Sequence, residues 1–483
     1  MGIPLLTACS AVADGEHDHE SPSTVSTGNQ SFINLTIAVS GGKDNTTRAG
    51  EKPTAGEDGD GREAGFPHED AVTGITLILY QGSGINDVAT TAIDFVAYYP
   101  VSKTTKDTDD KIEATYETGK QLLDQSKVDL TKTYHAIVVA NADLRGAIST
   151  SSTLGQVRNH IIRTLYSGNE KTQPARDCAN FVMSSENDYT VTFDSYTTIP
   201  EGRLYSFEGL RIERMTARID FWAAGATYDD VHKGYAYDAG TADKFVVTGL
   251  MPFNLMGANS TNGGEYLIKR VATSPTSTDY TYLGNEGSNF VIDPAILVKT
   301  TSGELTYYKN KVLDFGTLAG HATYSGANDY YRSTENLHAA IVTTSPASGG
   351  YTALTDGALT GEDVVLCYPM ENTLQTSSYL YSFATGIVIE GDYYQGGFSG
   401  TKTHRIYYGY LRHEGTAASY QARLGAAFEL DKASALPPAS PMEYGIVRNN
   451  IYRIYISSIT SESMILSLKV KKWDPYTHDW IYM

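Results

Sequence analysis

Short segments in which apolar and polar residues alternate recur along the chain. The first lies close to the N-terminus and places Ile33, Leu35, Ile37 and Val39 on one face. Asn34, Thr36, Ala38 and Ser40 fall on the other face, which is the period of two that a half-buried β-strand requires. Comparable segments, joined by connections rich in Gly, Asn and Ser, are 72–81, 92–100, 133–141, 188–193, 244–251, 265–271, 338–344, 363–369, 384–393, 404–411, 446–457 and 464–473.

This spacing of short strands predicts an all-β chain of antiparallel β-sandwiches. The chain has 483 residues, and single cores rarely exceed about 250–300 residues, so at least two tandem domains are expected. The strand pattern resets in 197–209, and the boundary is predicted at about residue 205. One minor helix is expected in 153–166, where apolar residues recur at helical spacing; these are Leu154, Val157, Ile161, Ile162 and Leu165.

Charge and motifs exclude several classes of function. The formal net charge of −19 argues against a nucleic-acid partner, because phosphate repels an acidic surface. The sequence lacks the usual nucleophile, zinc-protease and phosphate-loop motifs, so no enzyme and no cofactor are expected. The tract His17–Glu20 is interpreted as part of an acidic tether. The tract Asp107–Lys111 lacks the Gly and Glu of a calcium loop, so no metal site is predicted.

The three cysteines do not form a disulfide framework. Cys178 and Cys367 are far apart in the sequence and are predicted to be separate buried thiols. Cys9 closes the sequence LLTAC, which has the order of a bacterial lipobox, although the preceding residues are too few for a full signal peptide. No segment approaches the about 18 apolar residues of a membrane span. Cys9 is therefore expected to carry a lipid anchor.

A long polar segment follows the first predicted strand. Residues 41–65 are rich in Gly, Asp and Thr and show no periodicity. A loop of this length within a compact domain is often functional, and exposed loops of small polar residues are favoured by proteases. Its only arginines are Arg48 and Arg62, and either could direct cleavage that separates the first strand from the rest of the chain.

The C-terminal region repeats the pattern of the first strand. Met464, Leu466, Leu468 and Val470 occupy alternate positions, and polar Ser467, Lys469 and Lys471 lie between and beyond the later ones, so this segment could fill the same groove as residues 33–39. One interpretation is that it completes its own domain. The other is that a cut in the loop releases the first strand and that the C-terminal segment of another molecule replaces it, gaining main-chain hydrogen bonds and side-chain pockets.

Several longer motifs support the second interpretation. They are LTAC, TTRAG, ERMTARIDF, YPMENTLQTSSYLYSFATGIVIEGDY, YGIVRNNIYRIYISSI and LKVKKW. Together they make the chain resemble the fimbrillin, or type V pilin, family of Bacteroidales surface fimbriae, in particular shaft subunits of the short-fimbria type. The resemblance implies two transthyretin-like sandwiches, lipidation of Cys9, cleavage at Arg48–Ala49 and polymerisation by strand exchange. Arg62 remains the alternative cleavage site.

The resemblance also assigns the segments. They are a signal remnant 1–9, a propeptide with the first strand 10–48, an N-terminal domain 49–204, a C-terminal domain 205–460 and a donor segment 461–483. The displaced strand would be Phe32–Ser40 and the donor Ser461–Trp473, with Trp473 as its last apolar residue.

The resemblance further implies a fimbrial stalk subunit at the outer membrane and cell surface that supports adhesion. Its expected partners are copies of itself, accessory tip and anchor fimbrillins, an Arg-specific surface protease and, before cleavage, the outer membrane. The alternatives are a tip or anchor subunit, or a monomeric surface lipoprotein that binds a glycan or a protein.

Overall fold

The computed structural model describes the chain in sixteen stretches. They are residues 30–39, 62–84, 90–106, 114–158, 160–162, 164–167, 178–223, 225–232, 234–253, 265–266, 332–333, 363–369, 385–411, 418–424, 446–461 and 463–474. Cys9, Arg48, Ala49 and the expected strand at 338–344 lie outside these residues.

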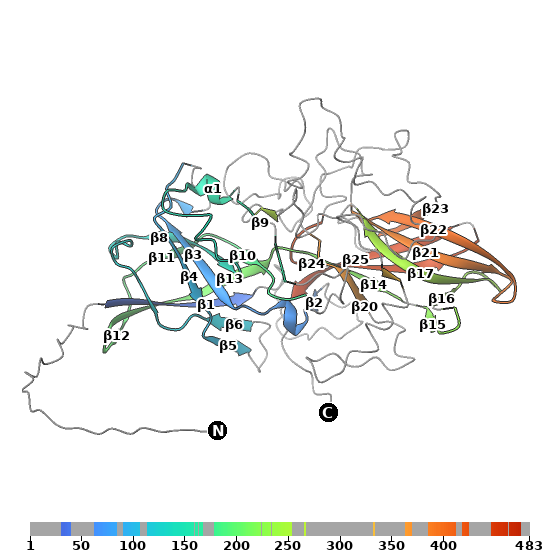
Figure 1. Cartoon of the computed structure of the whole chain (residues 1–483), viewed down its shortest axis with the longest axis horizontal. Helices are drawn as coiled ribbons and strands as arrows, with labels where there is room; N and C mark the ends of the chain where they lie inside the picture. The colour runs from blue at the N-terminus through green and yellow to red at the C-terminus, as the bar shows by residue number, and fades with distance from the viewer. Residues whose placement is uncertain are drawn as a thin grey trace, which may run out of the picture.

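The first sheet is built almost wholly from the N-terminal half of the chain (Figure 1). Its strand order is β4 (Phe95–Pro100), β3 (Gly74–Tyr80), β8 (Tyr134–Ala140), β10 (Met183–Ser185), β13 (Gly202–Arg214), β1 (Gln30–Val39), β6 (Ala114–Glu117) and β5 (Lys103–Lys106). Three short strands pair at the side of this path; they are β11 (Tyr189–Val191) on β8, β12 (Thr197–Ile199) on β13 and β7 (Gln121–Leu122) on β1.

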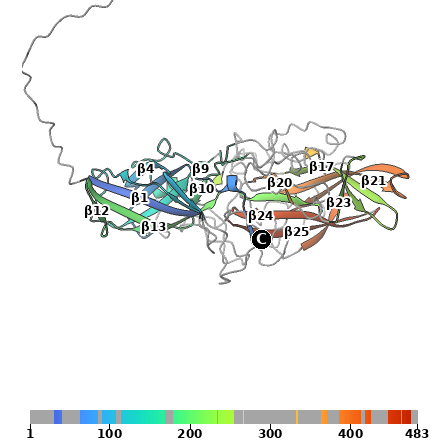
Figure 2. The same ribbon diagram turned by 90° about the horizontal axis from the view of Figure 1, so that it is seen from below.

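The second sheet combines later strands and occupies the opposite end of the elongated molecule (Figures 1 and 2). Its order is β15 (Thr227–Asp229), β16 (Gly234–Asp238), β17 (Lys244–Phe253), β21 (Gly386–Gln395), β22 (Thr401–Tyr410), β23 (Ala418–Leu424), β25 (Met464–Asp474), β24 (Asn450–Ile459), β14 (Arg218–Trp222) and β20 (Asp363–Cys367). Two short strands join it, β19 (Arg332–Ser333) on β17 and β2 (Arg62–Ala64) on β25, while β18 (Glu265–Tyr266) pairs separately with β9 (Ile161–Ile162).

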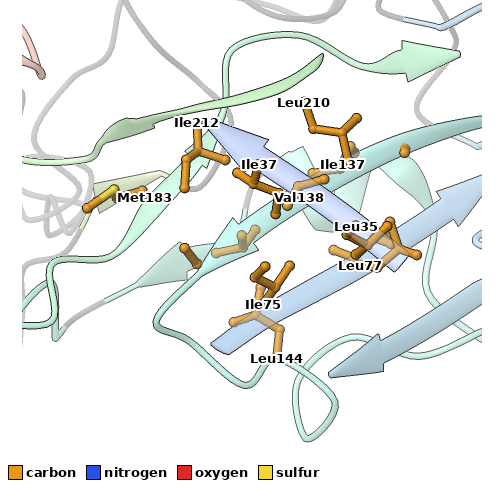
Figure 3. Packing of buried hydrophobic residues seen from close by; sticks show 14 of the residues in the cluster. Leu35, Ile37, Ile75, Leu77, Ile137, Val138, Leu144, Met183, Leu210 and Ile212 are labelled. Carbon is orange, nitrogen blue, oxygen red and sulfur yellow. The ribbon is translucent and has the colours of Figure 1, made fainter. Parts of the chain in front are cut away.

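Two apolar cores underlie these sheets and give an all-β sandwich fold, as predicted. Strand β3 has the sequence GITLILY and is buried along its whole length, which suits a strand covered on both faces. Figure 3 shows Leu35 and Ile37 of β1 packed among Ile75 and Leu77 of β3 and other residues of the first core. The second core is formed by residues of the second sheet and its connections. Cys178 lies in the first core and Cys367 in the second, and both are buried free thiols, as predicted.

The strand pairing is not purely antiparallel. Within the described residues, β1 runs parallel to β13, β14 runs parallel to β24, and β2 runs parallel to β25, whereas the other named pairings are antiparallel. Residue 205 lies inside β13, whose full length belongs to the first sheet. The chain passes from the first sheet to the second between Arg214 and Arg218.

The predicted helix is much shorter than its apolar spacing suggested. Helix α1 spans only Leu154–Arg158, and Ile161–Ile162 form β9 instead. The prediction that this minor helix continues to residue 166 was wrong, because Ile161 and Ile162 pair with Tyr266 and Glu265 in a short strand instead. The side chains that produced the helical pattern are nevertheless buried or half-buried, so the apolar face was correctly identified.

The start of β1 lies so close to β13 that Gly202 leaves no space for a side chain. A Cβ atom at Gly202 would lie 1.9 Å from the carbonyl oxygen of Gln30, and the residue has φ +150°. We expect Gly202→Val to separate the first residues of β1 from β13 and to lower the free energy of unfolding by more than about 1 kcal/mol. Chemical denaturation measures this change.

Gly146→Ala is the matched control for this substitution, because no atom lies within 4 Å of the added Cβ. It should leave the unfolding midpoint almost unchanged. Equal stability of the two variants would contradict the close approach of β1 and β13.

Candidate strand-exchange site

Strand β1 is an interior strand of the first sheet. Along one edge it runs parallel to β13, from Gln30 opposite Gly202 to Val39 opposite Ile212. Along the other edge it pairs antiparallel with β7 and β6. Its removal would therefore uncover two strand edges, each with backbone groups that need new hydrogen-bond partners.

Hydrogen bonds from residues directly after β6 and directly after β7 also hold β1. The backbone N–H of Thr118 donates to Leu35 O at 3.1 Å, and that of Leu123 donates to Ser31 O at 2.9 Å. The Leu35 N–H in turn donates to Thr118 Oγ1 at 3.0 Å, inside the protein. These bonds fix the register of β1 at a point where the adjacent strands are short.

The four apolar residues predicted on one face of β1 are all buried. Ile33, Leu35, Ile37 and Val39 are at most 1% exposed and belong to the first core. Together they are worth roughly 6–12 kcal/mol in transfer free energy, at about 1.5–3 kcal/mol for each side chain. The stability of the first core therefore depends on the segment that occupies the position of β1 in the sheet.

The predicted donor segment forms an interior strand of the second sheet. Strand β25 pairs antiparallel with β24 on one side and with β23 on the other. Met464, Leu466 and Leu468 are at most 1% exposed in the second core, while Val470 is partly buried against it. In this chain the C-terminal segment therefore completes its own sheet, and its donation to a second molecule would require β25 to leave β23 and β24.

The end of β25 contacts the first core rather than the second. Trp473 is fully buried in the first core, and its ring stacks on Tyr368 with centroids 5.8 Å apart. Its indole N–H donates to Glu69 Oε2 at 3.0 Å, and its backbone N–H donates to Asn449 O at 3.1 Å. The Arg214 guanidinium lies 4.3 Å from the ring centroid. Trp473 thus connects the last strand of the second sheet to the first sandwich.

Arg62, the alternative cleavage site, lies in β2 directly beside this tryptophan. The backbone of Arg62–Ala64 pairs in parallel with Lys472–Asp474 of β25. The chain then turns through the short 3-10 helix η2 (Pro67–Glu69). The backbone N–H of Phe66, the residue before this helix, donates to Glu69 Oε2 at 2.6 Å. The segment that follows the polar loop is therefore fixed against the C-terminal strand.

A buried cluster of charged residues surrounds this contact. Arg214 forms an ion pair with Asp70, and its Nη1 donates to Asn449 Oδ1 at 2.9 Å. Arg218 contacts both Glu69 at 3.2 Å and Asp220 at 2.8 Å. Glu69 and Asp70 lie at the end of η2. Arg214 ends β13 and Arg218 begins β14, so the two arginines lie on either side of the passage between the sheets. Five charged side chains, those of Glu69, Asp70, Arg214, Arg218 and Asp220, are fully buried.

Strand β6 reaches from β1 to the same cluster. Tyr116 of β6 lies opposite Ile37 of β1, and its hydroxyl donates to the backbone oxygen of Asp70. Burial, followed by the nearby Asp70 carboxylate, raises the pKa of Tyr116, so the phenol retains its proton and remains a donor. One side chain therefore links the neighbour of β1 to the residues around Trp473.

The sequence pattern missed the burial of this cluster. In residues 215–221, Met215, Ala217, Ile219 and Phe221 are buried as their alternation indicates, but Arg218 and Asp220 on the opposite face are buried as well. The polar face is covered because it meets Glu69, which lies 149 positions earlier than Arg218. The alternation of apolar and polar residues within one strand does not indicate a partner so far away in the sequence.

Within the described residues, no cluster of three or more His, Cys, Asp or Glu side chains suits a metal ion. No helix in the same part of the chain is long and apolar enough to cross a membrane.

No protein-family model matches the chain, and no curated protein sequence matches it. Among solved structures, the chain is similar to a fimbrilin (FimA) from Porphyromonas gingivalis, with 12% identity, a TM-score of 0.37, and coverage of 94% of this chain and 100% of the other. It is also similar to a C-terminally truncated tip fimbrial protein, Mfa3, from the same species. That match has 10% identity, a TM-score of 0.37, and coverage of 92% of this chain and 100% of the other.

These similar structures are fimbrial proteins.

Proposed function

We propose that the chain is a structural subunit of a cell-surface fimbria that assembles by strand exchange. Proteolysis in the loop after β1 would release this strand, and the C-terminal segment of a second copy would replace it. The observation that carries the proposal is that β1, although joined to the domain through a long polar loop, supplies a central strand and four fully buried side chains.

The segment Met464–Val470 suits this vacancy because it repeats the spacing of β1. Met464, Leu466, Leu468 and Val470 can present four apolar side chains on one face, as residues 33–39 do. A strand inserted between β13 and β6 would also gain main-chain hydrogen bonds along two edges, each worth about 0.5–1.5 kcal/mol net. Before cleavage, β1 has the advantage of being in the same molecule, so its high effective concentration favours the closed subunit.

We assign the scissile bond to Arg48–Ala49 rather than to the bond after Arg62. The backbone of Arg62 is paired with β25, and Gly65, three residues later, is buried. A protease binds its substrate as an extended segment, so cutting after Arg62 would first require β2 to leave β25. Cleavage at Arg48 spares these contacts and leaves β2 on the subunit.

Limited digestion by an arginine-specific protease tests this assignment, because trypsin would also cut after Lys43 in the same loop. Arg48→Ala is expected to slow the first cut by at least about ten-fold and to prevent SDS-resistant ladders, because the arginine that the protease would recognise is removed. Arg62→Ala serves as the matched control and should be cut at the wild-type rate. Gel electrophoresis with mass spectrometry measures both. Early cutting at Arg62 in the wild-type protein would contradict the assignment, and cleavage without ladders would favour a monomeric binding protein.

The remaining features of the proposal follow the sequence motifs. Lipidation of Cys9 would anchor the uncleaved subunit to the outer membrane, and an Arg-specific surface protease would release it for assembly. Accessory tip and anchor fimbrillins would complete the fimbria, which would support adhesion without an enzymatic activity. Radiolabelled palmitate incorporated by wild-type protein but not by Cys9→Ala would support the lipid anchor.

A further inference from the structure

We propose that Gly65 and Glu69 form a latch that retains the end of β25 in its own subunit, and that opening of this latch limits the rate of strand donation. This inference rests on the proposed strand exchange and assigns control of that step to residues on the far side of the loop from β1. The latch is defined here as Gly65 and Glu69 together with Trp473, which they enclose.

The latch fits closely around the indole ring. A Cβ atom at Gly65 would lie 2.6 Å from Trp473 Nε1 and 2.9 Å from Glu69 Oε2, so only glycine allows the indole and the carboxylate to meet. The adjoining β2 strand pairs with the backbone of Lys472–Asp474. Withdrawal of β25 must therefore break both the side-chain contact and a strand pairing.

Glu69 is the residue on which these contacts converge. Its Oε2 accepts from the Trp473 indole at 3.0 Å and from the Phe66 backbone at 2.6 Å. Its Oε1 accepts from the Tyr368 hydroxyl at 2.7 Å. If Trp473 leaves, a buried carboxylate loses one of its donors, which opposes the departure.

The latch stays with the subunit after cleavage at Arg48. Residues 62–70 follow the scissile bond, so a cut there separates β1 from β2 but leaves β2, Gly65 and Glu69 in contact with β25. Cleavage would open the acceptor position without freeing the donor. Cleaved monomers should consequently accumulate before polymers form, and the length of this delay should depend on the latch.

Glu69→Gln in the full-length protein tests the inference. The amide group replaces one carboxylate oxygen with a donor, so either the Trp473 side or the Tyr368 side loses its acceptor. Folding should survive, because Arg214 retains Asp70 and Arg218 retains Asp220. We expect amide hydrogen exchange at the end of β25 to become about ten-fold faster in the uncleaved monomer, and the delay before ladders to shorten after digestion by the arginine-specific protease.

A second variant and a matched control complete the experiment. Trp473→Phe keeps an aromatic ring beside Tyr368 but removes the indole donor, so it should change exchange in the same direction without altering a buried charge. Glu201→Gln is the control, because the Glu201 side chain is 44% exposed and forms a surface ion pair with Lys120. It should leave both exchange and the delay unchanged.

The outcomes separate the latch from the proposed function. Wild-type exchange at the end of β25 in both Glu69→Gln and Trp473→Phe would overturn the latch whether or not polymers form. Faster exchange with an unchanged delay would overturn its control of donation. Faster exchange in a protein that never polymerises after cleavage would instead overturn the proposed strand exchange, and with it the control of donation.

Discussion

Ile37→Ala is expected to lower the free energy of unfolding of the uncleaved subunit by about 2–5 kcal/mol, the usual range for an isoleucine truncated in a core. Ile37 is fully buried in the first core and lies in the C-terminal half of β1 (Figure 3). In the assembled, cleaved subunit the same substitution should have no effect, because β1 would have left. Chemical denaturation of the uncleaved monomer and of purified polymer measures the two values.

Leu77→Ala is the matched control for Ile37→Ala. Leu77 belongs to β3 and is 1% exposed in the same core, but no cut in the loop removes it. It should destabilise the uncleaved monomer and the polymer alike. If Ile37→Ala also destabilised the polymer as Leu77→Ala does, β1 would still be in place after assembly.

Leu466→Ala is expected to lower the stability of both the uncleaved monomer and the assembled polymer. In the monomer it removes a fully buried side chain of the second core and should cost about 2–5 kcal/mol. In the polymer the same residue would fill the position of β1 in a neighbouring subunit, so the SDS-resistant ladders should dissociate faster. Denaturation of the monomer and timed dissociation of ladders measure the two effects.

Ile387→Ala separates these two roles of Leu466. Ile387 is fully buried in the same core but lies in β21, outside the predicted donor segment. It should destabilise the monomer to a similar degree while leaving the dissociation of ladders at the wild-type rate. Equal effects of both variants on the ladders would indicate that another segment is donated.

The sequence predicted the strands well because a period of two is a local property. The alternation in residues 32–40 and 464–473 located β1 and β25 to within two residues at each end and identified their buried faces. These side chains are apolar on one face because each strand covers a core. The helix in 153–166 was overextended because apolar spacing alone does not reveal that Ile161 and Ile162 pair with a distant strand.

The neighbours of each strand could not be predicted from the same patterns. The parallel pairing of β1 with β13 joins residues more than 170 positions apart, and nothing within either strand specifies the other. The charged cluster was missed for the same reason, since Arg214 and Asp70 are separated by 144 positions. Each of these charges resembles a solvated residue until its partner is placed beside it.

The terminal sequence of the assembled subunit tests the central claim most directly. Mass spectrometry of protein recovered from surface filaments should find Ala49 as the first residue and no peptide that contains Ile33–Val39. Filaments whose subunits retain these residues in covalent continuity with Gly65 would contradict the replacement of β1 by a second molecule.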